Sequence, residues 1–246
     1  MRTIHGLICG AALLTSGVGA AEHWYNPLQP GTSSILLPSG SQPVLYDQSA
    51  PPGPPGSYNA TYDIELPEYT SEGADDFQVT GAGWDVTGFT FDIGFVWPSG
   101  DLYTGPSSYH VWVYADQAGL PAATALCGGA DLPGTRLDPS SNSGTIVVPL
   151  ATPCALPPGR YWVGLSVALI VPPSAMWGYA GSEAFLLHSA VWRNPGDGFG
   201  YGCTVWEPVL DCLRFNPGGG FPNFRFQVLG TPATLPDPIF TDGFES

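Results

Sequence analysis

Hydrophobic and polar residues alternate along most of this chain with the period of two that is expected of β-strands with one buried face. The clearest run is 84–97, where Phe89, Phe91 and Ile93 share one face. The run over 161–169 is apolar on both faces, which favours a central strand. Comparable patterns predict the remaining strands at 44–47, 109–114, 146–150, 184–193 and 224–229.

Glycine and proline separate these runs, and the 33 glycines and 27 prolines leave little room for long helices. The proline-rich stretch 49–57 predicts a loop that cannot join a central strand, since proline lacks the backbone donor. Residues 120–126 are compatible with a helical turn. The whole pattern predicts an all-β fold, an antiparallel two-sheet sandwich of jelly-roll-like type.

The first residues have the features of a secretory signal peptide. Arg2 is followed by a short apolar run, and small residues precede Glu22, so we expect residues 1–21 to be removed on export. We then expect an N-terminal arm over 22–43, a β-sandwich domain over 44–230, and a proline-rich linker and tail over 231–246. These features predict a secreted protein, extracellular or at the cell surface.

Four cysteines remain after removal of the leader. An even number in an exported chain predicts two disulfides. Pairing of neighbours, Cys127 with Cys154 and Cys203 with Cys212, is favoured over the other two arrangements because each bridge would clip adjacent elements. A zinc site is disfavoured because the chain has no Cys-x-x-Cys motif.

The charge balance excludes several partners. Against 21 acidic residues there are six basic ones, all arginine, and the formal net charge is −15. Nucleic acid is excluded because there is no basic footprint. No mature stretch is apolar enough for membrane insertion. No cofactor is expected, although an acidic chain of this kind is compatible with a structural Ca²⁺ ion.

The stretch 194–212, NPGDGFGYGCTVWEPVLDC, is rich in glycine and predicts a shaped surface loop pinned by a bridge. Together with Trp192 it carries Phe199, Tyr201 and Trp206, which are the candidate ligand-binding residues. Flat aromatic rings can stack on the apolar face of a sugar. The alternative is that these rings fill the sandwich core and cover the disulfide.

No catalytic residue is assigned. Several carboxylates could in principle supply a glycosidase pair, but nothing in their spacing selects one: Asp75, Asp76, Asp85, Asp92, Glu207 and Asp211. The histidines lack metal-binding spacing, and those at 110 and 188 fall in predicted strands, which favours packing.

Three motifs together resemble a family of secreted bacterial β-sandwich proteins that has no assigned activity: ADDFxV at 74–79, YWxxLS at 161–166 and NPGxGFGxGCxxW at 194–206. The last motif is specific. The ending IFxDGFE at 239–245 is similar to a short tail found on unrelated exported proteins, which implies a role in export or surface handling.

These features favour a non-catalytic module that binds a glycan or another cell-surface component. Two alternatives stay open: a secreted hydrolase with converging carboxylates, and a purely structural surface or matrix protein. Solvent-exposed rings would support the first hypothesis, and buried rings the last.

Overall fold

The computed structural model describes nine stretches of the chain. The predicted signal peptide, nearly all of the predicted arm and most of the predicted tail lie outside them. The described residues are 42–49, 52–59, 61–63, 65–96, 108–137, 143–169, 176–182, 187–212 and 222–234.

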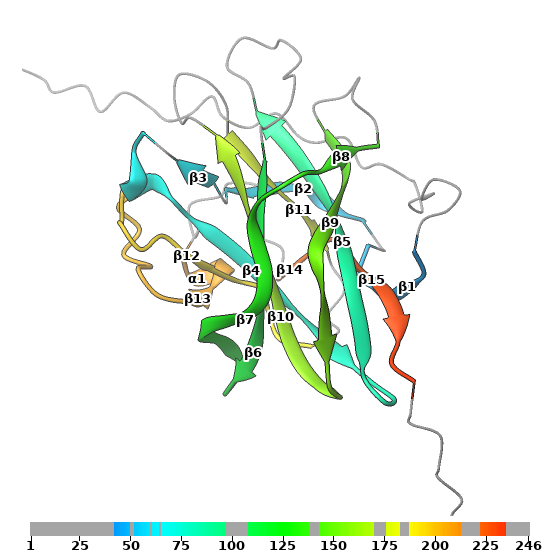
Figure 1. The fold of residues 1–246 in the computed structure, drawn as a ribbon. Coiled ribbons are helices and arrows are strands. Elements are labelled where there is room, and N and C mark those ends of the chain that lie inside the picture. The colour runs from blue at the N-terminus through cyan, green and yellow to red at the C-terminus, as the bar shows by residue number, and fades with distance from the viewer. Residues whose placement is uncertain are drawn as a thin grey trace, which may run out of the picture.

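The described residues form two β-sheets packed face to face, which confirms the predicted all-β sandwich (Figure 1). The eight-stranded sheet has the order β1-β15-β5-β11-β14, with β9 and β2 added on β5 and β11, and β8 on β9. Its strands are β1 (Val44–Asp47), β2 (Pro52–Asn59), β5 (Trp84–Val96), β8 (Thr135–Arg136), β9 (Ser143–Leu156), β11 (Met176–Ser182), β14 (Asn223–Phe224) and β15 (Phe226–Pro232).

The seven-stranded sheet has the order β13-β12-β4-β10-β6-β7, with β3 added on β10. All its pairings are antiparallel except the short parallel pair β3–β10. Its strands are β3 (Thr61–Asp63), β4 (Glu72–Val79), β6 (Tyr109–Gln117), β7 (Leu120–Leu132), β10 (Gly159–Leu169), β12 (Val191–Arg193) and β13 (Glu207–Pro208). A 3₁₀ turn η1 (Pro67–Tyr69) precedes β4, and one helical turn α1 (Val209–Cys212) follows β13.

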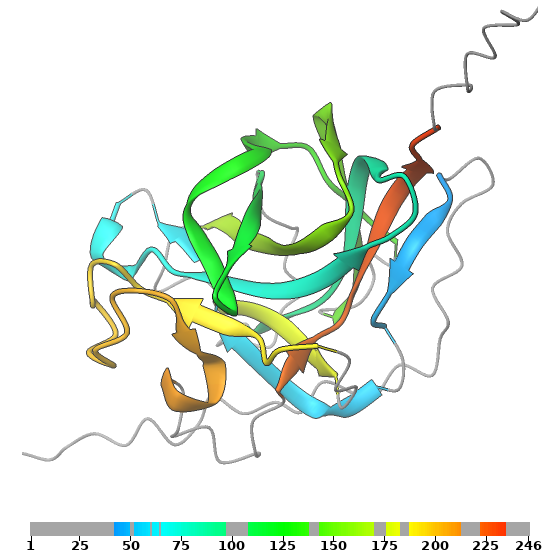
Figure 2. The same ribbon diagram turned by 90° about the horizontal axis from the view of Figure 1, so that it is seen from below.

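The chain passes repeatedly between the sheets, as in jelly-roll-like sandwiches. Viewed along the strands, the sheets curve around a shared interior, and β1 lies beside β15 at one edge (Figure 2). The alternating residues meet inside: Phe77 of β4, Phe89 and Phe91 of β5 and Phe226 of β15 are all buried and in ring contact. The period-two pattern therefore placed the core correctly. The Cys127–Cys154 disulfide, predicted above, joins β7 to β9 and so links the two sheets.

Residues 120–126 are not helical, so that expectation was wrong: they form the first half of β7. Ala118 and Gly119 both have positive φ, of 56° and 84°, which is the conformation of a tight hairpin turn. Leu120 pairs with Gln117 directly after this turn. Pairing with β6 thus overrides a local sequence that has no Asn-Gly or Asp-Gly turn signal.

The structure also changes the predicted strand 184–193 and the predicted loop 49–57. Within the described part of 184–193 only Val191–Arg193 is a strand, because the backbone N–H of His188 donates to the Asp76 carboxylate and not to a neighbouring strand. The predicted loop 49–57 contains the start of β2, which pairs with β11. That edge position is where a proline-rich strand is tolerated.

No described helix is long and apolar enough to span a lipid bilayer.

Candidate functional site

The glycine-rich stretch is a loop that leaves the edge of the seven-stranded sheet after β12 and returns through β13 and α1 (Figure 1). Cys203 and Cys212 are bridged, as predicted, with their Cα atoms 5.8 Å apart. Both residues are buried, and Cys212 Sγ lies 3.9 Å from the Trp192 carbonyl oxygen. The bridge thus fastens the end of the loop to the strand from which it starts.

Asn194 fixes the other end of the loop. Its amide Nδ2 donates to the carbonyl oxygens of Glu68 and Thr70, each at 2.7 Å. Its Oδ1 accepts the backbone N–H of Phe199 at 3.2 Å. Asn194 is almost fully buried. One side chain therefore ties the loop both to η1 and to its own middle.

The glycines of this loop are required for two different reasons. A Cβ on Gly196 or Gly198 would collide with the backbone of Glu68, so these two allow the loop to lie directly on η1. Gly200 and Gly202 have open space around them but positive φ, of 69° and 79°. A left-handed backbone favours glycine because a Cβ would be strained there.

This backbone displays two rings, which we call the aromatic ledge: Phe199 and Tyr201. Their centroids lie 6.0 Å apart with planes 13° from parallel. Tyr201 is 45% exposed and Phe199 is partly buried. Trp192 packs behind both rings, at 6.2 and 6.0 Å, and the edge of Tyr69 supports Phe199 at 5.1 Å.

Of the four predicted ring residues, the structure brings three together and places the fourth elsewhere. Trp192 is fully buried, so it supports the ledge from the core side. Trp206 is only 8% exposed and packs against Tyr114 on the outer face of the seven-stranded sheet. The rings that solvent can reach are therefore those of the ledge, and their binding role stays a prediction.

Trp206 packs on a partly buried ion pair that the sequence did not reveal. Arg193 Nη2 donates to Glu72 Oε2 at 2.6 Å, and Tyr114 donates its hydroxyl to Glu72 Oε1 at 2.7 Å. Burial, followed by the nearby Glu72 charge, raises the pKa of Tyr114. Gly164 makes room for this network, because a Cβ there would collide with the Glu72 carboxylate.

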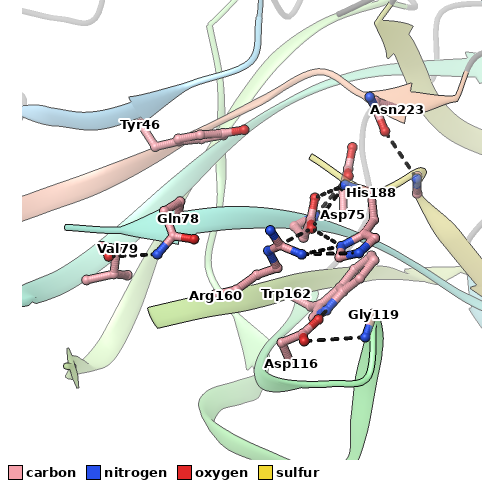
Figure 3. Close-up of polar contacts among 12 residues, drawn as sticks. Tyr46, Asp75, Gln78, Val79, Asp116, Gly119, Arg160, Trp162, His188 and Asn223 are labelled. Atoms are coloured by element: carbon pink, nitrogen blue, oxygen red, sulfur yellow. Dashed lines mark hydrogen bonds and ion pairs between the residues drawn. The ribbon is translucent and has the colours of Figure 1, made fainter. Parts of the chain in front are cut away.

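A second ion-pair group lies further along the same outer face. His188 Nδ1 lies 2.9 Å from Asp76 Oδ2, and Arg160 Nε lies 3.7 Å from the same oxygen. Figure 3 shows Arg160 and His188 together beside Trp162, whose ring stacks on the imidazole at 6.0 Å. Burial raises the pKa of Asp76, and the bonds and charges from His188 and Arg160 oppose that rise.

The carboxylates considered for a glycosidase pair are tied into separate contacts. Asp75 and Asp76 are adjacent on β4 and point to opposite faces of the sheet. Asp92 pairs with Arg225 on the eight-stranded sheet at 2.9 Å. Glu72 and Asp76 share a face of β4, but Glu72 is bonded to Arg193 and Tyr114. Asp76 is paired instead with His188 and Arg160.

Among the described residues, Cys203, Glu207 and Cys212 have potential metal-ligand atoms within 4.8 Å of one another. The two sulfurs are joined in the disulfide and so offer no thiolate, which is the form that binds metals. This group does not fit a metal site, and a structural Ca²⁺ ion stays a prediction.

Comparisons with known proteins leave the family open. No family model and no curated protein matches the chain. One solved structure, the cysteine protease and lectin-like domains of Cwp84, a surface layer associated protein of Clostridium difficile, aligns with a TM-score of 0.43 and 16% identity. The alignment covers 66% of this chain and 32% of that one, so it spans about a third of the other protein.

The sequence indicates the rings of the ledge, Trp192 and the Cys203–Cys212 bridge, but not the contacts that hold the loop on η1. Asn194, Gly196 and Gly198 stand in the motif that the resemblance uses, yet their roles depend on η1, which lies over 120 residues away, as in the Asn194–Glu68 bond. The Glu72–Arg193 pair left no signal in sequence spacing, because 121 residues separate the partners.

Proposed function

We propose that this chain is a non-catalytic binding module that takes a glycan on the aromatic ledge. The observation that carries the proposal is the exposed Tyr201 ring stacked on Phe199 at the surface of a fixed loop. A flat ring exposed to solvent can cover the apolar face of a pyranose. Such a ring otherwise serves no packing purpose on its open side.

The loop supports this use because its shape is set before any ligand arrives. The disulfide, the Asn194 bonds and the contact with η1 hold the ring pair in one place. A preorganised site loses less conformational freedom on binding, which leaves more of the contact energy for affinity. Each sugar of a polysaccharide makes few strong contacts, so a smaller loss of conformational entropy on binding matters for affinity.

Two further features support a location outside the cell. The Cys127–Cys154 disulfide links the two sheets and the Cys203–Cys212 disulfide closes the aromatic loop, and such bridges persist in oxidising compartments. The predicted signal peptide agrees with that compartment. An extracellular or cell-surface protein meets polysaccharides as its commonest neighbours.

The test is a glycan-array and polysaccharide pull-down screen of residues 22–246 with the disulfides formed. We expect saturable binding that Tyr201→Ala weakens about tenfold or more and that Tyr201→Phe largely retains. Val205→Ala is the matched control, because Val205 is 63% exposed in the same bridged segment. Absence of glycan binding, or equal binding by Tyr201→Ala, would refute the proposal. Release of reducing ends would support the hydrolase alternative.

A further inference from the structure

Charge is unevenly distributed around the aromatic ledge. The loop 194–212 and the segment 65–70 beneath it contain five carboxylates and no lysine, arginine or histidine. The five carboxylates are Glu65, Glu68, Asp197, Glu207 and Asp211. The ledge therefore stands in an acidic part of a chain that already carries a net charge of −15.

Two of these acidic residues take part in the contacts that shape the loop, Glu68 through its backbone and Asp197 through its side chain. Glu68 is exposed, and its carbonyl oxygen accepts the backbone N–H of Gly198 at 2.9 Å, one residue before Phe199. Asp197 Oδ1 accepts the backbone N–H of Gly202 at 2.8 Å, so this carboxylate spans the turn that presents Tyr201. One carboxylate is therefore held at the turn that presents Tyr201, and a second, exposed acidic residue lies in the turn on which the loop packs.

The arginine that directly precedes the loop, Arg193, is already paired within the described structure. Arg193 directly precedes Asn194, but its guanidinium is bonded to Glu72 at 2.6 Å and lies 4.1 Å from the Trp206 ring centroid. Arg160 and Arg225 are likewise held by Asp76 and Asp92. None of these three cations is left to pair with an acidic ligand at the ledge.

We infer that the ledge selects an uncharged polysaccharide and rejects acidic ones, an inference that rests on the proposed glycan-binding function. Stacking of a sugar on Tyr201 and Phe199 requires no ionic partner. A uronate or sulfate at the same place would meet like charge from Glu68 and Asp197. Like charges brought together across an interface are a strong means of rejecting the wrong partner.

The test measures binding to polysaccharides of matched length: an uncharged glucan, mannan and galactan, acidic polygalacturonate and hyaluronan, and cationic chitosan. Each is measured at low and high salt, with Ca²⁺ and with a chelator. We expect at least one uncharged polymer to bind more than tenfold more tightly than either acidic one. That binding should be insensitive to salt, lost in Tyr201→Ala and retained in Val205→Ala.

A charge variant tests the stated cause. Glu68→Gln should raise affinity for the acidic polymers without changing affinity for the uncharged one. Asp85→Asn is the matched control, since Asp85 is exposed on β5 of the other sheet. Equal effects of the two substitutions would show that overall charge, and not the ledge environment, sets the preference, and would overturn the inference.

The remaining outcomes separate this inference from the function on which it rests. Tyr201-dependent binding of an acidic polymer, with or without Ca²⁺, would overturn the inference and keep the glycan-binding function. If chitosan alone bound in a Tyr201-dependent manner, and salt abolished that binding, the inference would likewise be overturned and the glycan-binding function kept. Binding of no polymer at all would reject both.

Discussion

Arg193 and Trp206 are stacked, with the guanidinium Cζ 4.1 Å from the centroid of the indole ring. The same guanidinium donates through Nη2 to Glu72 Oε2 at 2.6 Å. The tryptophan thus packs on a partly buried ion pair, and a cation over an indole face is itself attractive. This relationship assigns Trp206 to the support of the sheet rather than to the surface of the ledge.

Trp206→Ala should therefore destabilise the fold by about 3 kcal/mol or more, through loss of a buried ring and exposure of the Arg193–Glu72 pair. Trp206→Phe should lose less, because an aromatic face remains. Chemical denaturation at neutral pH measures both variants. A Trp206→Ala protein as stable as the wild type would contradict the packing role.

The Cys203–Cys212 disulfide should also contribute measurably to the free energy of unfolding. Replacing both cysteines with serine should lower the free energy of unfolding by about 2–3 kcal/mol. Without the bridge, this short loop is no longer closed in the unfolded chain, so the unfolded state gains conformational entropy. Thermal melting without reductant reports the change. We also expect weaker glycan binding, because the loop loses one of its fixed ends. Identical melting of the two proteins would argue against this bridge.

The glycines of the loop should differ in their response to alanine. Gly200→Ala meets no neighbour and suffers only from its left-handed backbone, which costs about 1–2 kcal/mol. Gly196→Ala collides with the backbone of Glu68 and must push the loop from η1. We expect Gly196→Ala to be the more destabilising of the two and to disturb the ledge. Denaturation curves of the two variants make the comparison, and the reverse order would contradict the contact.

Asp75 should make stability depend on pH. Burial, only partly offset by the hydrogen bond from the Phe224 N–H, raises the pKa of this carboxyl well above its usual value. Between the usual pKa, near 4, and the raised one, the folded state binds more protons than the unfolded state. Stability from this group is therefore present at low pH and lost as pH rises through that window.

Asp75→Asn removes this dependence. The amide oxygen can still accept from Gln48 and Phe224, while the amide nitrogen faces the Asp76 N–H, a loss of about 1 kcal/mol. The variant should be less stable than the wild type at acidic pH. The difference in stability should shrink as pH rises, because only the wild type loses stability through the titration of Asp75. Urea denaturation across this range gives the difference, and a constant difference would show that Asp75 does not titrate there.

The sequence alone determined the class of fold. The alternation of Phe89, Phe91 and Ile93 with polar neighbours can bury one face only in a sheet, and that pattern is local. The cysteine pairing also followed from the sequence, because the partners are near neighbours along the chain. The surface exposure of a glycine-rich aromatic loop was likewise visible, though not which rings it would expose.

Tertiary structure decided the rest. Whether Trp192 and Trp206 were buried depended on β4, β6 and β10, which are far away in sequence and cover them. The hairpin at Ala118–Gly119 formed because β6 offered a partner for β7. Arg193 lies beside Glu72 only because β12 pairs with β4. Local periodicity follows from neighbouring residues, whereas burial and ion pairing follow from contacts that exist only once distant strands lie side by side.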